Sequence, residues 1–128
     1  TDAINIKDAF FINIGLEFEI IVFKNFNNQQ VLFRCLEEIR KYFDIDRWQI
    51  NQPIIISEIY NVIGAVEGVQ SVPSVGITNL VGSDLGYSPY KYDLDDATIK
   101  GIIYPSLDPS IFEIRFPNQD IKGRITQY

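Results

Sequence analysis

Apolar and polar residues alternate along the segment from Phe10 to Phe23. The polar parity includes Glu17 and Glu19, and the apolar parity holds Phe10, Ile12, Ile14, Leu16, Phe18, Ile20 and Val22. A period of two with one apolar face predicts a β-strand that packs one side on a core. We therefore expect one long strand here, with both glutamates facing solvent or a partner.

The next segment changes to a helical period. The chain breaks at Lys24 to Asn28, and apolar residues then recur three or four positions apart, at Leu32, Cys35, Leu36, Ile39 and Phe43. This spacing predicts a helix that ends at about Phe43. Asn27 or Asn28 is suited to cap its first turn, because an asparagine side chain accepts a hydrogen bond from a free backbone N–H.

The segment from Ile54 to Val66 carries a second apolar stripe, at Ile56, Ile59, Ile63 and Val66. The stripe favours a helix, but Ile and Val are mediocre helix formers, so a strand from Pro53 to Ile56 competes for its start. Gly68 stands where a left-handed helix terminus is expected. Both interpretations of the first residues stay open.

The middle of the chain predicts a strand followed by a long loop. Val69 to Val81 is typical of a strand, and Pro73 confines that point to a sheet edge or a bulge. Gly82 to Pro109 is rich in Gly, Ser, Pro, Asp and Tyr and predicts an extended loop, with a short strand at Ile99 to Tyr104. A loop this long in a compact domain is usually functional or held by a neighbour.

The C-terminal segments predict a strand pair. Ile111 to Phe116 and Ile121 to Ile125 are separated by Pro117 to Asp120, whose residues favour a turn. Together the elements indicate one α+β domain over residues 1–128. We expect a ferredoxin-like sandwich in which two helices pack on one face of a mainly antiparallel sheet, with a long loop and a C-terminal hairpin.

Composition limits the class of function. The chain has 128 residues, is 46% hydrophobic and carries a net charge of −6, so we expect a folded domain that does not bind nucleic acid. No apolar run approaches the about 20 residues that span a bilayer, and no membrane partner is expected. The first residue is Thr and the chain has no Met, which favours a fragment of a longer protein over removal of an initiator Met.

Few residues offer catalytic chemistry. The absence of histidine excludes Ser-His-Asp and Cys-His arrangements, and the single Cys35 falls on the predicted core stripe. The acidic groups are better explained as solvated side chains than as a metal site at Asp93, Asp95 and Asp96 or an acid/base pair at Glu17 and Glu19. We expect no enzyme, no cofactor, no metal and no small-molecule substrate.

The tyrosines of the long loop form the strongest candidate for a contact surface. These candidate residues are Tyr87, Pro89, Tyr90, Tyr92 and Tyr104. Tyrosines give large contact areas and are enriched at protein interfaces, but they can equally cover the domain's own sheet. Phe112, Arg115 and Phe116 of the predicted hairpin complete the candidate set. We also expect the domain to self-associate through the loop.

Two stretches resemble a known family. The first runs from Trp48 to Ile54 (WQINQPI) and continues through Ser57–Tyr60 and Val66–Val69; the second is Tyr104–Ile125. They resemble the C-terminal part of baseplate J-like wedge proteins, which form the inner baseplate ring of T-even-like contractile-tailed phages. The likeness covers roughly residues 10–125, and members of the family are much longer than this chain.

The resemblance implies a structural role in the virion. Proteins of this family dimerise and join into a ring around the central hub, after assembly in the host cytoplasm, and contribute no catalytic residues. It implies other wedge proteins, a second copy or a ring neighbour as partners.

Two other functions remain. A small-ligand-binding regulatory module would need a glycine-lined pocket, for which Gly64, Gly68 and Gly76 are candidates. A carboxylate-dependent hydrolase would rest on Glu17 and Glu19.

Overall fold

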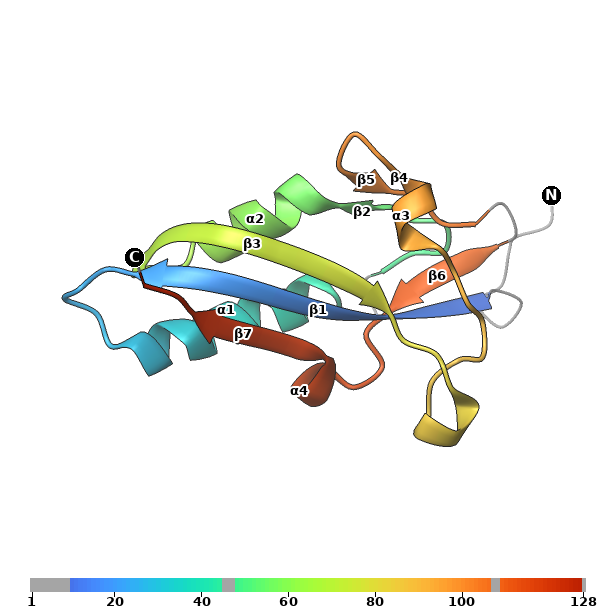
Figure 1. The fold of residues 1–128 in the computed structure, drawn as a ribbon, viewed down its shortest axis with the longest axis horizontal. Coiled ribbons are helices and arrows are strands. Elements are labelled where there is room, and N and C mark those ends of the chain that lie inside the picture. Colours follow the sequence, from blue (N-terminus) through green and yellow to red (C-terminus); the bar gives the residue numbers. More distant parts are fainter. Residues whose placement is uncertain (1–9, 45–47, 107–108, 128) are drawn as a thin grey trace.

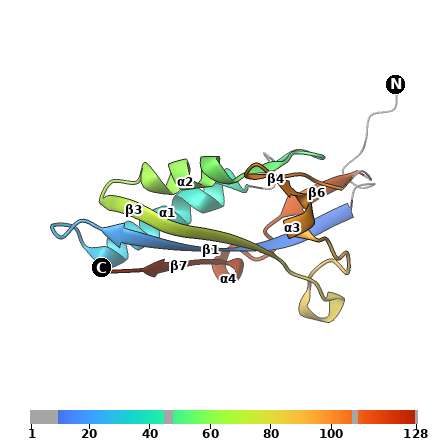
Figure 2. The same cartoon turned by 45° about the horizontal axis from the view of Figure 1, so that its top comes forward.

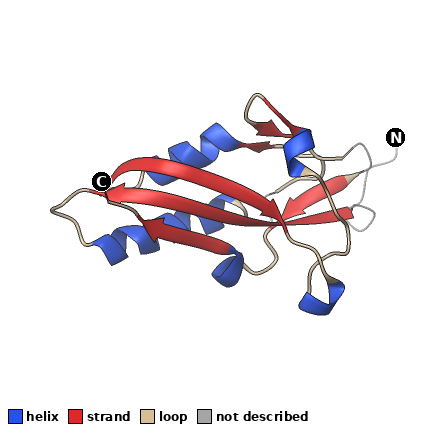
Figure 3. Cartoon of the chain, viewed as in Figure 1, coloured by secondary structure: helices blue, strands red, loops and turns tan. Residues whose placement is uncertain are grey.

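Two helices cover one face of a four-stranded sheet, and a small three-stranded sheet lies at one end (Figure 1, Figure 2). This arrangement comes from a computed structural model, which describes residues 10–44, 48–106 and 109–127. Figure 3 shows the same chain coloured by helix and strand. The prediction of an α+β domain with both helices on one face is confirmed.

The long predicted strand is the centre of the sheet. β1 spans Phe10–Val22, and its even-numbered residues from Ile12 to Ile20 are almost completely buried. β3, Val69–Asn79, pairs with β1 along one edge, while β6, Ser110–Glu113, and β7, Ile121–Ile125, pair with it on the other. The alternation of the sequence thus directs one face of the central strand into the core.

Helix α1, Asn28–Tyr42, begins and ends close to the predicted positions. Asn27 is the N-cap, and its side chain accepts a hydrogen bond from the Gln30 N–H at 3.0 Å. The helix presents Val31, Cys35 and Ile39 to the core, so the buried stripe lies slightly to one side of the predicted one.

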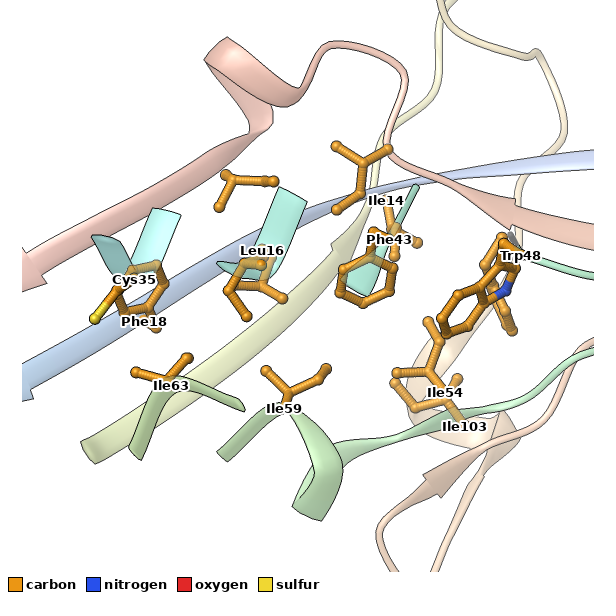
Figure 4. Close-up of a cluster of buried hydrophobic side chains, with 14 of the residues drawn as sticks. Ile14, Leu16, Phe18, Cys35, Phe43, Trp48, Ile54, Ile59, Ile63 and Ile103 are labelled. Atoms are coloured by element: carbon orange, nitrogen blue, oxygen red, sulfur yellow. The ribbon is translucent and has the colours of Figure 1, made fainter. Parts of the chain in front are cut away.

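The core lies between the helices and the even-numbered residues of β1. Figure 4 shows Ile14, Leu16 and Phe18 facing side chains of both helices. The facing residues include Cys35, Ile59 and Ile63, and the cluster extends through Phe43 and Trp48 to Ile54 and Ile103 of the small sheet. Burial of this apolar stripe is the main force that holds the helices on the sheet.

Both interpretations of the Ile54 to Val66 segment prove correct in part. β2 is Ile54–Ile55, and helix α2, Ile56–Gly64, follows it directly. Ile59 and Ile63 are buried as predicted. Gly68 has a φ of 100°, and a Cβ there would overlap Val31 and Phe26, so its conformation and its space both require glycine.

β3 has the interruption that Pro73 predicts. The register passes from Glu19 opposite Ser74 to Ile21 opposite Ser71, which leaves one extra residue on β3. β3 is also an edge strand. Pro73 therefore lies in a bulge on an edge, where its missing N–H breaks no ladder hydrogen bond.

The predicted C-terminal hairpin is wrong. Ile111 to Phe116 and Ile121 to Ile125 do not pair with each other; β6 pairs with Phe10–Asn13 and β7 with Leu16–Ile20. The turn-like residues form helix α4, Pro117–Asp120, with Pro117 in its first turn. Because β1 is 13 residues long, two short strands fit end to end along one of its edges.

The mainly antiparallel sheet is also corrected. β3 runs antiparallel to β1, but β6 and β7 both run parallel to it. The finer ferredoxin-like arrangement is therefore not confirmed. The long connections from β1 to β3 and from β5 to β6 allow the next strand to run in either direction relative to β1. The period-two pattern of a single strand does not encode that direction.

The predicted loop from Gly82 to Pro109 contains short elements. They are η2, Ser83–Leu85, α3, Leu94–Ala97, β4, Thr98–Ile99, and β5, Ile102–Ile103. The predicted short strand is a hairpin whose turn residues Lys100 and Gly101 both have positive φ, and β5 also pairs with β2. Residues 107–108 of this loop lie outside the described residues.

Candidate functional site

The buried side chain of Asn13 fastens the tyrosine loop to the sheet. Asn13 is 1% exposed and lies on the face of β1 opposite the helices. Its amide donates to Glu113 Oε1 at 2.8 Å, and its Oδ1 accepts from the Ser88 N–H at 2.6 Å. Asn79 donates to the Asn13 carbonyl at 2.9 Å and accepts from the Tyr92 N–H at 2.9 Å. Two asparagines thus set the path of residues 80–92.

Tyr87 is held by a second polar contact. Its hydroxyl donates to the carboxylate of Asp120 at 2.9 Å, and Asp120 is 7% exposed. The Tyr87 ring packs edge-on against Phe116, and Arg115 lies 5.6 Å from the centre of the Phe116 ring. Burial, followed by the hydrogen bond and the charge of Asp120, raises the pKa of Tyr87. These residues form the Tyr87–Asp120 cluster, which joins the loop to α4.

The other loop tyrosines form an aromatic row with the end of the sheet. Tyr90 stacks on Phe10 at 5.0 Å and on Tyr92 at 6.4 Å between ring centres. Tyr92 then tilts against Phe112, and its hydroxyl donates to the Tyr104 carbonyl at 2.6 Å. The row is therefore attached to the domain's own sheet along its whole length.

The predicted contact residues divide into buried and accessible ones. Phe112 was predicted as a contact residue, but it is 1% exposed and belongs to the core, because its parity on β6 places it opposite buried Ile12. Tyr87, Tyr90, Tyr92 and Phe116 are half-buried. Tyr104, Pro89 and Arg115 are exposed.

Phe10 is a surface residue, although the alternation along β1 predicts that it faces the core. It is 48% exposed although it shares the apolar parity of β1, because it lies at the outer end of the strand. Asn13 and Asp120 were also missed. The only local signal for Asn13 is that it is an uncharged polar residue on the parity that otherwise carries Glu17 and Glu19.

The two strand glutamates do not form a paired acid and base. Glu19 accepts hydrogen bonds from Thr126 and forms an ion pair with Arg124. The Thr126 hydrogen bond, followed by Arg124, lowers the pKa of Glu19. A general acid needs a raised pKa, so Glu19 is unsuited to that role. Glu17 is exposed on the same face.

The other reactive groups have structural roles. Cys35 is 0% exposed, and burial raises the pKa of its thiol to about 11, which makes it a poor nucleophile. Asp93 caps α3 by accepting from the Asp96 N–H at 3.1 Å. Among the described residues no group of three His, Cys, Asp or Glu side chains could hold a metal ion.

The three glycines proposed for a ligand pocket do not gather around one cavity. Gly68 is packed against Phe26 and Val31, while Gly64 and Gly76 face open space. A depression of about 400 Å³ does lie on the open sheet face, lined by Glu17, Gly76, Lys122 and Arg124 among others. Within the described ranges, no helix has the length and apolar character needed to cross a membrane.

Comparison with known proteins gives no relative on which to base a role. No family model matches the chain, and no curated protein matches it. The site must therefore be judged on its own geometry. That geometry is a set of aromatic side chains on a framework of buried hydrogen bonds, and the reactive groups take part in hydrogen bonds, ion pairs or the core.

Proposed function

We propose that this chain is a structural domain of a contractile-tail baseplate wedge, which acts in the virion through protein–protein contacts alone. Its partners are other wedge proteins, including a second copy or a ring neighbour. The proposal rests on the likeness of residues 48–69 and 104–125 to wedge proteins. Of the predicted ferredoxin-like fold, only the two helices over one sheet face support the proposal. The strand directions do not, because β6 and β7 run parallel to β1.

The observation that carries a contact role is the rigid aromatic row. Phe10 is 48% exposed and stacks on Tyr90, and Tyr104 is 43% exposed and accepts a hydrogen bond from the Tyr92 hydroxyl through its backbone carbonyl. The asparagine hydrogen bonds fix the loop before any partner arrives. A pre-organised aromatic surface loses little conformational entropy on binding, which favours affinity.

A small-ligand regulatory module has less support. The depression on the open sheet face is lined in part by the charged side chains of Glu17 and Lys122, and its Arg124 is already paired with Glu19. Ligand pockets are mostly apolar and enclose their ligand. We therefore retain the wedge domain as the proposed function.

Two measurements test the proposal. Sedimentation velocity of the domain should show concentration-dependent dimers that weaken when Phe10 and Tyr104 are changed to Ser. The matched control is Phe33→Ser, which removes an aromatic ring that is 60% exposed on α1. A monomer at every accessible concentration would refute self-association through the aromatic row.

The genes beside the coding sequence test the class of protein. Tail and baseplate genes on both sides are expected. A neighbourhood without structural virion genes would contradict the baseplate assignment, whatever the sedimentation result.

A further inference from the structure

The outer edge of β3 presents backbone groups that point away from the sheet. The Leu80 N–H donates to the Asn13 carbonyl at 2.8 Å, which makes Ile14 and Asn79 a non-hydrogen-bonded pair. In such a ladder every second residue turns its N–H and C=O outward. On β3 these residues are Val75, Ile77 and Asn79.

Part of this edge is capped and part is bare. The Val75 N–H donates to the Tyr60 hydroxyl of α2 at 3.1 Å. Within residues 10–44, 48–106 and 109–127, the backbone N–H groups of Ile77 and Asn79 meet no acceptor. An unpaired edge of this kind is a template for another strand.

Within the strand itself, the residues that usually block an edge lie in the first half of β3. Pro73 and the bulge interrupt pairing near Ser71 to Ser74. From Ser74 to Asn79 the strand is straight in register, and β3 contains no charged residue at all. Natural edge strands are commonly blocked by lysine, proline or a bulge, and this second half has none of them.

A groove runs along the edge from the capped Val75 to the bare Ile77. It has a volume of about 480 Å³ and lies between Val75–Ile77 and the small sheet with α3. The far wall is formed by Ile56, Leu94, Thr98 and Ile103, with Asp95 at its side. Figure 1 shows α3 and β4 opposite the C-terminal half of β3. A groove with a second wall admits one extended chain more readily than the whole sheet of a second copy.

Charge indicates what kind of chain fits. Asp95 of α3 lines the groove, and both Asp96 of the same helix and its N-cap Asp93 are exposed. The chain as a whole has a net charge of −6. Acidic groups beside an apolar wall favour a segment in which aliphatic residues alternate with lysine or arginine.

We propose that β3, from Val75 to Asn79, binds an extended basic segment of a partner protein by β-strand addition. Backbone hydrogen bonds to Ile77 and Asn79 supply the pairing, the apolar wall accepts aliphatic side chains, and Asp95 attracts the basic ones. This inference is independent of the baseplate proposal, because it rests only on the fold.

The probe is an acetylated and amidated heptapeptide of alternating valine and lysine. Titration into the ¹⁵N-labelled domain should shift the Ile77 and Asn79 amide resonances saturably and slow their hydrogen exchange by about tenfold or more. The matched control is the same peptide N-methylated at every residue. It keeps the side chains but has no backbone N–H to donate from either edge, so it should bind much more weakly.

Two charge reversals complete the test. Asp95→Lys should weaken binding about three- to tenfold, whereas Asp84→Lys on η2 should leave it unchanged. Unfolding curves of both variants establish that they are folded. Unchanged exchange at Ile77, equal binding of the N-methylated peptide, or equal effects of the two reversals would overturn the proposal. Protection of Ile77 in a dimer of the domain would overturn it as well, because the occupant would then be a second copy.

Discussion

Asn13 shows how one residue can determine the form of a surface. It is an almost fully buried polar residue of β1, and it lies at the centre of hydrogen bonds to Glu113, Ser88 and Asn79. A buried amide without partners is costly, whereas one with all partners present specifies a single arrangement. The tyrosine loop therefore has one docked position.

Replacement of Asn13 by Ala should destabilise the domain by about 2–3 kcal/mol, because it leaves the Ser88 N–H and the Glu113 carboxylate without their partner. Urea unfolding followed by circular dichroism measures this loss. Asn118→Ala is the control, since Asn118 is an exposed residue of α4. Equal stability of the two variants would contradict the role of Asn13.

The segment between β6 and β7 determines how the elements join. Residues 114–120 leave the sheet, form α4 and return to the same edge of β1. Through Tyr87 and Asp120, this excursion also holds the loop that follows β3. Two connections far apart in the sequence thus form one rigid unit.

Tyr87→Phe should make local opening of residues 80–92 more frequent. The change leaves the buried Asp120 carboxylate without the hydroxyl donor and should cost about 1–2 kcal/mol. Hydrogen exchange at the Ser88 amide should accelerate while α1 is unaffected. Tyr104→Phe is the control, because its ring is 43% exposed. A uniform acceleration throughout the domain would argue against a local unit.

Side-chain contacts join the first strand of the molecule, β1, to its last strand, β7. Glu19 of β1 meets Arg124 of β7 and Thr126 across more than 100 positions of sequence. The pKa of Glu19 is lowered by these partners. A carboxyl whose folded-state pKa is lowered stabilises the protein above its unfolded pKa, and this stabilisation disappears as pH falls through the folded value.

Glu19→Gln should therefore reduce stability at neutral pH, and the difference from the unchanged protein should shrink below about pH 4. Chemical unfolding between pH 2.5 and 7 measures it. Glu67→Gln provides the control at an exposed position. A difference that stays constant with pH would show that the carboxylate charge is not involved.

Local features of the fold were predictable from the sequence, because the residues that form them are neighbours. The parity of Ile12 to Ile20, the Asn27 cap and the Pro73 bulge agree with the structure. The prediction of a terminal hairpin was wrong because the turn-like residues 117–120 do not reveal that β1 is long enough to pair with both β6 and β7. The candidate surface was found in part: the tyrosines were named, but their attachment to Asn13 and Asp120 was not.

The sequence by itself determined the periodic elements, the buried cysteine and the lack of histidine chemistry. Only the tertiary structure decided the directions of β6 and β7, the burial of Phe112 and the bare edge at Ile77. The physical reason is that side-chain periodicity fixes which face of an element is apolar. Strand partners depend instead on backbone hydrogen bonds between distant segments, and these are nearly independent of residue type.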